Sequence, residues 1–225
     1  MNTPEKVPVL LDCGTSYTKV LYTENGTRAI YPTRRIKEYI GGMRVIAATG
    51  HNASRFSLSV TNELLALAKS TNDLMRANPG AAVVDCGSRD IKYITINSEN
   101  AVSIDWNTEC GAFCGQLIEL LTSYFGFDVS SIHPADKPLA LPCGILGMTR
   151  MFDLIADDVD PEIAFARFMR GMADNIYRFC GEPDTIYLSG GLCDNPLFIK
   201  SFSRSEVIPL GRFVLLDGLK KTLSE

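Results

Sequence analysis

A pattern of ten residues occurs twice in this chain of 225 residues. Leu10-Leu11-Asp12-Cys13-Gly14 is followed by Lys19, and Val83-Val84-Asp85-Cys86-Gly87 is followed by Lys92 at the same offset. In each copy an apolar strand runs into Asp-Cys-Gly, where glycine permits backbone angles and close approaches that a β-carbon would obstruct. Because each copy would open one lobe with a strand, a tight turn and a returning strand, the repeat predicts two similar lobes.

A tight turn of this kind exposes amides and hydroxyls that suit phosphate oxygens. The first copy holds four candidate groups of this kind: Gly14, Thr15, Ser16 and Thr18. Asp12, at the end of the strand, could orient a hydrated magnesium ion. Lys19 either adds charge there or lies at the surface. The alternative is an ordinary β-hairpin with a glycine turn, and it is the repetition that favours a binding role.

Composition and charge narrow the classes of protein. With 46% apolar residues, the chain can bury a sizeable core in one large domain or two closely packed lobes. A net charge of −4 and the absence of a long basic stripe argue against nucleic acid as a partner. No apolar segment approaches the length that spans a bilayer, so we expect a soluble cytoplasmic protein.

The chain has seven cysteines, an odd number that disfavours a complete disulfide framework without a secretory signal. Reduced thiols or metal thiolates are then expected. Cys13 and Cys86 occupy matching places in the repeated strands, which indicates packing. Cys180 and Cys193 are interpreted as buried or incidental thiols. The remaining three are Cys110, Cys114 and Cys143.

Hydrophobic periodicity predicts a mixed α/β chain. We expect a first lobe over residues 1–80 and a second over 81–225, closely packed, with a C-terminal helix that returns to the first lobe. Strands are predicted at 7–12, 19–22, 45–50, 82–85, 91–97 and 101–105, and helices at 62–70, 117–125, 145–157 and 161–180. Thr61 is the expected cap of the first of these helices.

Two further glycine-containing segments precede helices. Residues 110–115, Cys-Gly-Ala-Phe-Cys-Gly, form a small-residue entrance whose free N–H groups could face phosphate, or they form a plain capping loop. The strand at 185–189 enters Gly190-Gly191, where the backbone can approach a flat ring closely. In this order, two Asp-Gly hairpins, a helix entrance and a late Gly-Gly turn follow the plan of the actin/Hsp70/sugar-kinase ATPase superfamily.

Within that superfamily the chain resembles the activator ATPases of 2-hydroxyacyl-CoA dehydratases and the related benzoyl-CoA reductase subunits (the BadF/BadG/BcrA/BcrD type). The resemblance covers nearly the whole chain. The segments that carry it are residues 12–19, 85–92 and 107–112, Cys143 before its helix, and Gly190-Gly191 through Asn195-Pro196. It implies a duplicated ribonuclease H-like, actin-like ATPase fold, with two lobes and a nucleotide cleft.

The resemblance also implies an activity of anaerobic metabolism. Family members are homodimers in which two cysteines from each subunit hold one 4Fe-4S cluster, and the corresponding positions are Cys110 and Cys143. ATP binding and hydrolysis would then drive a low-potential electron into a client dehydratase or reductase. Reduced ferredoxin or flavodoxin is the expected electron source. No membrane partner is implied.

For the nucleotide, the resemblance assigns roles residue by residue. Asp12 and Asp85 would position Mg²⁺ and water, with Asp90 as a further catalytic candidate. Gly190 and Gly191 would border the adenosine of ATP or ADP. The phosphate-site candidates are Gly14, Thr15, Ser16, Thr18, Lys19, Gly87, Ser88, Lys92, Gly111 and Gly115.

The chain departs from the family pattern at two of these motifs. Phe113-Cys114 stands where the family has Gly-Thr, and Ser88-Arg89 stands where Gly-Gln is usual. Such changes are compatible with a regulatory or scaffold member that has weak ATPase activity. A small-molecule kinase is the other alternative, although no acceptor motif is visible. Cys114 is either a spare ligand or a packed thiol.

Overall fold

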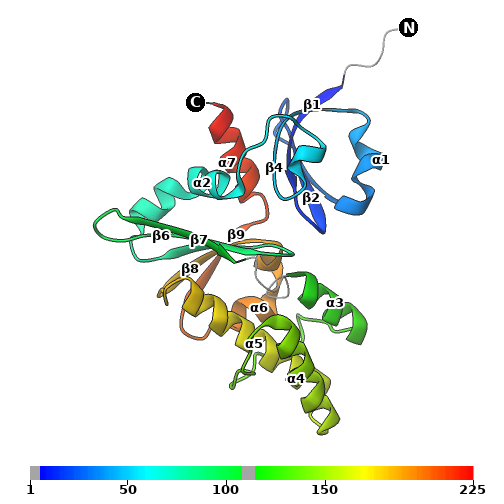
Figure 1. Ribbon diagram of the computed structural model, residues 1–225, viewed down its shortest axis with the longest axis vertical. Helices are drawn as coiled ribbons and strands as arrows, with labels where there is room; N and C mark the ends of the chain where they lie inside the picture. Colours follow the sequence, from blue (N-terminus) through cyan, green and yellow to red (C-terminus); the bar gives the residue numbers. More distant parts are fainter. Residues whose placement is uncertain (1–5, 108–114, 225) are drawn as a thin grey trace. The chain divides into compact units, whose positions relative to one another are not determined.

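The computed structural model describes residues 6–107 and 115–224. Cys110, Gly111 and Cys114, which the sequence singles out, lie outside these ranges. The chain divides into two compact units, residues 1–73 with 213–225 and residues 74–212. Each unit contains one sheet with its own helices (Figure 1).

The first unit is a four-stranded sheet in the order β3-β2-β1-β4. Its elements are β1 (Val7–Cys13), β2 (Tyr17–Tyr22), β3 (Arg28–Pro32), α1 (Ile36–Ile40), β4 (Met43–Thr49), α7 (Val214–Leu223) and the first part of α2 (Glu63–Ala77), with short 3-10 turns at Thr33–Arg35 and Ala53–Arg55. β1 pairs antiparallel with β2 and parallel with β4. On one face of the sheet, Leu216 and Leu219 of α7 pack against Leu10, Leu21 and Ala47.

The second unit is a five-stranded sheet in the order β7-β6-β5-β8-β9. Its strands are β5 (Ala82–Cys86), β6 (Ile91–Ile96), β7 (Val102–Asn107), β8 (Thr185–Gly190) and β9 (Glu206–Gly211). Its helices are α3 (Gly115–Phe125), α4 (Gly144–Ala156), α5 (Pro161–Phe179) and α6 (Pro196–Lys200), and a 3-10 turn covers Gly191–Asp194. α4 and α5 lie side by side (Figure 1).

The repeat in the sequence is a repeat in the topology. Each unit starts with an antiparallel three-stranded meander, and a later strand pairs parallel with the first strand of that meander, β4 in one unit and β8 in the other. The register is the same, since Asp12 faces Lys19 and Asp85 faces Lys92. The predicted fold class, a duplicated ribonuclease H-like fold, is confirmed.

The core of the second unit surrounds α5. Phe165, Phe168 and Met172 of this helix are buried against Val84 of β5 and Leu188 of β8. Asp160 caps the start of α5, because its carboxylate accepts from the amide of Glu162 at 2.8 Å. Within the described residues, none of the helices combines the length and apolar character that crossing a membrane requires.

Candidate functional site

The first hairpin places Asp12 and Lys19 in direct contact. Asp12 is the next-to-last residue of β1 and Lys19 stands opposite it on β2, and Nζ of the lysine lies 2.7 Å from Oδ2 of the carboxylate. The two side chains are only 2% and 12% exposed. A place at the surface was one of the two alternatives expected for Lys19, and this burial contradicts it. A nearly buried pair of this kind fixes the carboxylate in place.

The turn between β1 and β2 is held from outside the hairpin. A β-carbon on Gly14 would lie 2.7 Å from the carbonyl oxygen of Tyr17, so the turn requires glycine. The carbonyl of Gly14 accepts from Oγ1 of Thr33 at 2.9 Å and from Nδ2 of Asn52 at 3.3 Å. Thr33 also bonds the hydroxyl of buried Thr18 at 2.9 Å. Thr15 and Ser16 are half-buried in the turn.

The second hairpin uses the same residue types in a different pairing. Asp85 accepts a hydrogen bond from Oγ of Ser189 at 2.5 Å, and both residues are buried. Lys92 pairs with Asp90 instead, at 2.8 Å between Nζ and Oδ2. The turn is closed by the amide of Gly87, which donates to the carbonyl of Asp90 at 3.0 Å.

Three of the predicted motifs meet in the second unit. The amides of Gly115 and Gln116, at the start of α3, donate to the carbonyls of Gly87 and Ser88 at 2.9 and 3.2 Å. A β-carbon on Gly115 would also contact Leu192, which follows the Gly-Gly turn. The helix entrance, the second hairpin and the Gly-Gly turn are thus in contact. The N–H of Gly115 is used inside the protein, which the sequence did not indicate.

The two glycines of the late turn have different surroundings. Gly190 has φ +88°, and a β-carbon there would overlap the backbone of Cys86 on the neighbouring strand. Gly191 has open space where its β-carbon would be. Gly190 is therefore required by the packing of β8 on β5, whereas Gly191 leaves room above the turn.

Cys143 stands at the N-terminus of α4. Its backbone is extended, its carbonyl accepts from the amide of Gly147 at 2.8 Å, and its side chain makes no capping hydrogen bond. The residue is half-buried. A helix N-terminus stabilises a thiolate through its first amides and its dipole. Among the described residues no group of three or more His, Cys, Asp or Glu side chains could hold a metal ion.

Four other described cysteines are buried. Desolvation raises the pKa of Cys13, Cys180 and Cys193 to about 12, with neighbouring carboxylates adding to the effect at Cys13 and Cys193. Cys86 packs in the core of the second unit. Cys13, Cys180 and Cys193 are therefore protonated at neutral pH, and all four thiols pack as small apolar groups.

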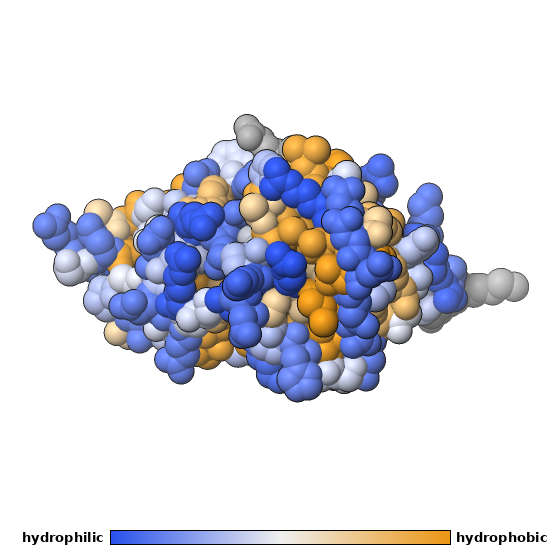
Figure 2. Space-filling model, turned by 90° about the horizontal axis from the view of Figure 1, so that it is seen from below, coloured by the Kyte–Doolittle hydropathy of each residue, from blue (hydrophilic) through white to orange (hydrophobic). Residues whose placement is uncertain are grey.

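Exposed apolar side chains gather on α3 and α4. Leu120 and Tyr124 of α3 and Ile145, Leu146 and Phe152 of α4 are all at least 38% exposed. Tyr124 and Phe152 contact each other edge to face. Figure 2, seen from the end at which α4 lies in Figure 1, shows apolar surface among hydrophilic side chains. A cluster of this kind is typical of a surface that another chain covers.

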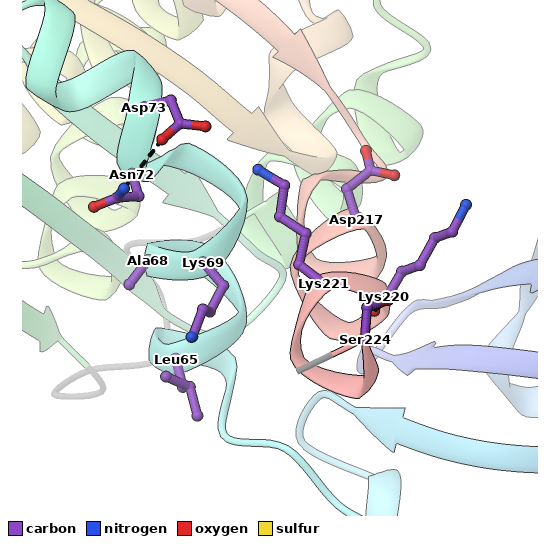
Figure 3. A pocket seen from close by; sticks show the side chains of 9 residues that line it. All are labelled: Leu65, Ala68, Lys69, Asn72, Asp73, Asp217, Lys220, Lys221 and Ser224. Atoms are coloured by element: carbon purple, nitrogen blue, oxygen red, sulfur yellow. Dashed lines mark hydrogen bonds between the residues drawn. The ribbon is translucent and has the colours of Figure 1, made fainter.

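A groove of about 880 Å³ lies between α2 and α7 in the first unit (Figure 3). Lys221 extends from α7 toward α2 and donates to the carbonyl of Ser70 at 3.3 Å. Lys220 and Lys221 belong to the last turn of α7, where cations stabilise a helix end. Asp217 is paired with Arg28 at 2.5 Å. Lys221 and Asp217 therefore have structural partners, and the groove is not our candidate site.

The structure adds residues that the sequence did not single out. Ser189 bonds Asp85, while Thr33 and Asn52 hold the carbonyl of Gly14. Ser189 had one available signal, because it directly precedes Gly190 at the end of an apolar strand. Thr33 and Asn52 lie in segments without any motif, and no pattern marks them.

Two solved structures of dehydratase activators resemble the chain over nearly its whole length. The activator of the 2-hydroxyisocaproyl-CoA dehydratase from Clostridium difficile, with bound ADPNP, gives a TM-score of 0.72 at 15% identity, covering 97% of this chain and 96% of that one. Component A of the Acidaminococcus fermentans (R)-2-hydroxyglutaryl-CoA dehydratase gives 0.70 at 16%, covering 96% of each. The fold is that of the dehydratase activators.

The predicted resemblance is thereby confirmed for the fold. Comparison with family models and with curated protein sequences gives no match. The activator fold is consistent with the duplicated meander and parallel crossover of both units. The roles of individual residues in this activator-like chain remain predictions.

Proposed function

We propose that this protein is an ATP-dependent activator that delivers low-potential electrons to a 2-hydroxyacyl-CoA dehydratase or a benzoyl-CoA-reductase-like client. The observation that carries the proposal is the whole-length likeness to two dehydratase activators, one of them with bound ADPNP. The position of Cys143 at a helix N-terminus supports it independently.

The nucleotide would use the two Asp-Gly hairpins. Asp12, held by Lys19, and Asp85, held by Ser189, are buried carboxylates in fixed positions, which suits the orientation of hydrated Mg²⁺ and of the attacking water. Thr15, Ser16, Gly87 and Ser88 would contact phosphates, and Gly190 and Gly191 would border adenosine. The hydrolytic step is transfer of the γ-phosphoryl group to water.

The cluster would be held by Cys110 and Cys143 of each of two subunits. Cys143 fits this role because it is half-buried and lies beside the first amides of α4. Cys110 lies outside the described residues. When bound, a 4Fe-4S cluster supplies a low-potential one-electron centre.

A second copy of the chain would cover the apolar side chains of α3 and α4. These helices start close to the two candidate ligands in sequence, since α3 follows Cys110 and α4 follows Cys143 directly. Burying Ile145 and Leu146 at a two-fold axis would exclude water from the neighbouring thiolates. The client enzyme and reduced ferredoxin or flavodoxin are the proposed partners of this dimer.

The test is anaerobic purification followed by measurement of iron, sulfide, subunit mass and ATP hydrolysis on one sample. We expect one 4Fe-4S cluster per dimer together with turnover of Mg-ATP. Cys110→Ser and Cys143→Ser should each abolish the iron-sulfur absorbance. Cys193→Ser, which replaces a buried thiol, should retain it. A full cluster in both ligand variants, or a metal-free monomer, would contradict the proposal.

One observation favours a regulatory member with weak turnover as the second candidate. The amides of Gly115 and Gln116 donate to the carbonyls of Gly87 and Ser88, so this helix entrance has two amides fewer to offer to phosphate. Cluster binding without measurable ATP hydrolysis in the same sample would support this candidate. Phosphorylation of a small molecule would instead support a kinase.

A further inference from the structure

The segment that leads to Cys143 is tied to α5. Residues 135–142, which we call the strap, precede the cysteine directly. The amide of Leu139 donates to the carbonyl of Arg167 at 2.8 Å, and Nδ2 of Asn175 donates to the carbonyl of Leu141 at 2.9 Å. Asn175 thus bonds the backbone two residues before Cys143, from a helix that contains neither candidate ligand.

Two glycines let the strap approach the helices closely. A β-carbon on Gly171 of α5 would overlap the carbonyl oxygen of Leu139, and one on Gly147 of α4 would overlap Cδ2 of Leu141. The buried side chain of Leu141 therefore lies in a notch between the two helices. α4 starts at the residue after Cys143 and is also bonded to the strap. Nη1 of its Arg150 donates to the carbonyl of Ala140 at 2.5 Å.

The end of the strap borders solvent on one side. Two open surface depressions, of about 370 Å³ and about 330 Å³, are both lined by Leu141, Pro142, Asn175 and Arg178. Because Leu141 and Pro142 face these open depressions on one side, van der Waals contact alone does not define the path into Cys143. The hydrogen bond from Asn175 supplies a fixed point at this place.

We infer that Asn175 is a positioning residue for Cys143. By holding the carbonyl of Leu141, it sets where the cysteine enters the N-terminus of α4 and hence where its thiolate points. The inference rests on the proposed function, in which Cys143 is a cluster ligand. α5 would then fix the position of Cys143, which is one of the two candidate cluster ligands in each subunit.

The test compares Asn175→Leu with Asn78→Leu. Asn78 is a matched control because its Nδ2 makes the same kind of bond, to the carbonyl of Leu74 at 2.8 Å, far along the chain from the strap. The first readout is the rate at which iodoacetamide alkylates Cys143 in cluster-free protein. Mass spectrometry of the peptide that contains Cys143 measures this rate. We expect Asn175→Leu to change the Cys143 rate by about fivefold, the equivalent of one net hydrogen bond, and Asn78→Leu to leave it unchanged.

The second readout uses protein reconstituted anaerobically with iron and sulfide. Asn175→Leu should shift the EPR line shape or midpoint potential of the cluster relative to both wild type and Asn78→Leu, which a merely structural role would not do. Equal Cys143 rates in all three proteins would overturn the inference. If wild type takes up no cluster, the proposed function fails, but the alkylation rates still decide whether Asn175 positions Cys143. Should Asn175→Leu not fold, Asn175→Ser removes the same bond with a smaller change.

Discussion

Nζ of Lys19 lies 2.7 Å from Oδ2 of Asp12, and this pair is nearly buried between two strands of the first unit. In the second unit the equivalent lysine, Lys92, faces Asp85 in the same register but pairs with Asp90. Asp85 instead accepts a hydrogen bond from Ser189. The two copies of the repeat therefore hold their strand-end carboxylates differently, one by a cation and one by a hydroxyl, so they should respond differently to mutation.

Lys19→Met should destabilise the protein strongly. The substitution leaves the carboxylate of Asp12 buried without its cation, which costs about 3–5 kcal/mol for a pair of this kind. Arg35→Met is the control, because the Arg35 and Glu38 side chains are each 54% exposed and a solvent-exposed pair of this kind contributes little to stability. Urea unfolding followed by circular dichroism measures both. Equal losses would show that Asp12 does not depend on Lys19.

Ser189→Ala should lower the turnover of Mg-ATP, because Ser189 holds the carboxylate of Asp85 in place. The carboxylate of Asp85 loses a hydrogen bond of 2.5 Å, and bonds to charged groups contribute about 1.5–3 kcal/mol, so we expect at least a tenfold loss in Mg-ATP turnover. Ser201→Ala is the control, since its buried hydroxyl bonds the Leu197 carbonyl at 2.7 Å on α6. Similar hydrolysis rates in the two variants would remove Asp85 from the catalytic set.

The strand arrangement could be predicted because the repeat carries it. Asp12 and Lys19 stand seven residues apart, as do Asp85 and Lys92, and equal spacing across equal turns produces equal registers. The first and last residues of individual helices were harder to predict. The helix expected over 62–70 continues to Ala77, because Thr71 and Met75 extend the buried face to which Leu67 belongs. Its start is capped by Asn62, which accepts from the amide of Leu64, and not by Thr61.

The candidate site was predictable only where its residues share a motif. The partner of Asp85 is decided by the parallel pairing of β5 with β8, which sets Asp85 opposite Ser189 although 104 residues separate them. Likewise Asn52 reaches Gly14 across 38 residues. No local pattern encodes contacts of this range. The internal use of the Gly115 amide also depends on a tertiary contact, with Gly87.

Gly190→Ala should cost more stability than Gly211→Ala. Both glycines have positive φ, +88° and +87°, so both substitutions carry a backbone penalty of about 1–3 kcal/mol. Only at Gly190 would the new β-carbon overlap the backbone of Cys86, whereas Gly211 has open space. The difference between the two variants in urea unfolding reports the close contact of β8 with β5. Equal losses would mean that β8 moves away from β5 at no cost.

The buried thiols predict a loss of stability at high pH. Burial raises the pKa of Cys180 from 9.0 to about 12, so the folded state keeps a proton that the unfolded state releases. The contribution of this group is therefore fully present below pH 9 and is lost as the pH rises through about 12. Lysines and tyrosines titrate in the same range, so the slope of wild type alone does not isolate the thiol.

Cys180→Ala isolates the effect of this thiol. The variant lacks the titrating group, so its free energy of unfolding should fall less steeply than that of wild type between pH 9 and pH 11, by up to about 1.4 kcal/mol per pH unit. The cavity left by the sulfur lowers stability at every pH and changes the offset of the curve, not its slope. Urea unfolding at pH 7, 9, 10 and 11 measures both proteins. Parallel curves would mean that Cys180 ionises in the folded protein as easily as in the unfolded chain.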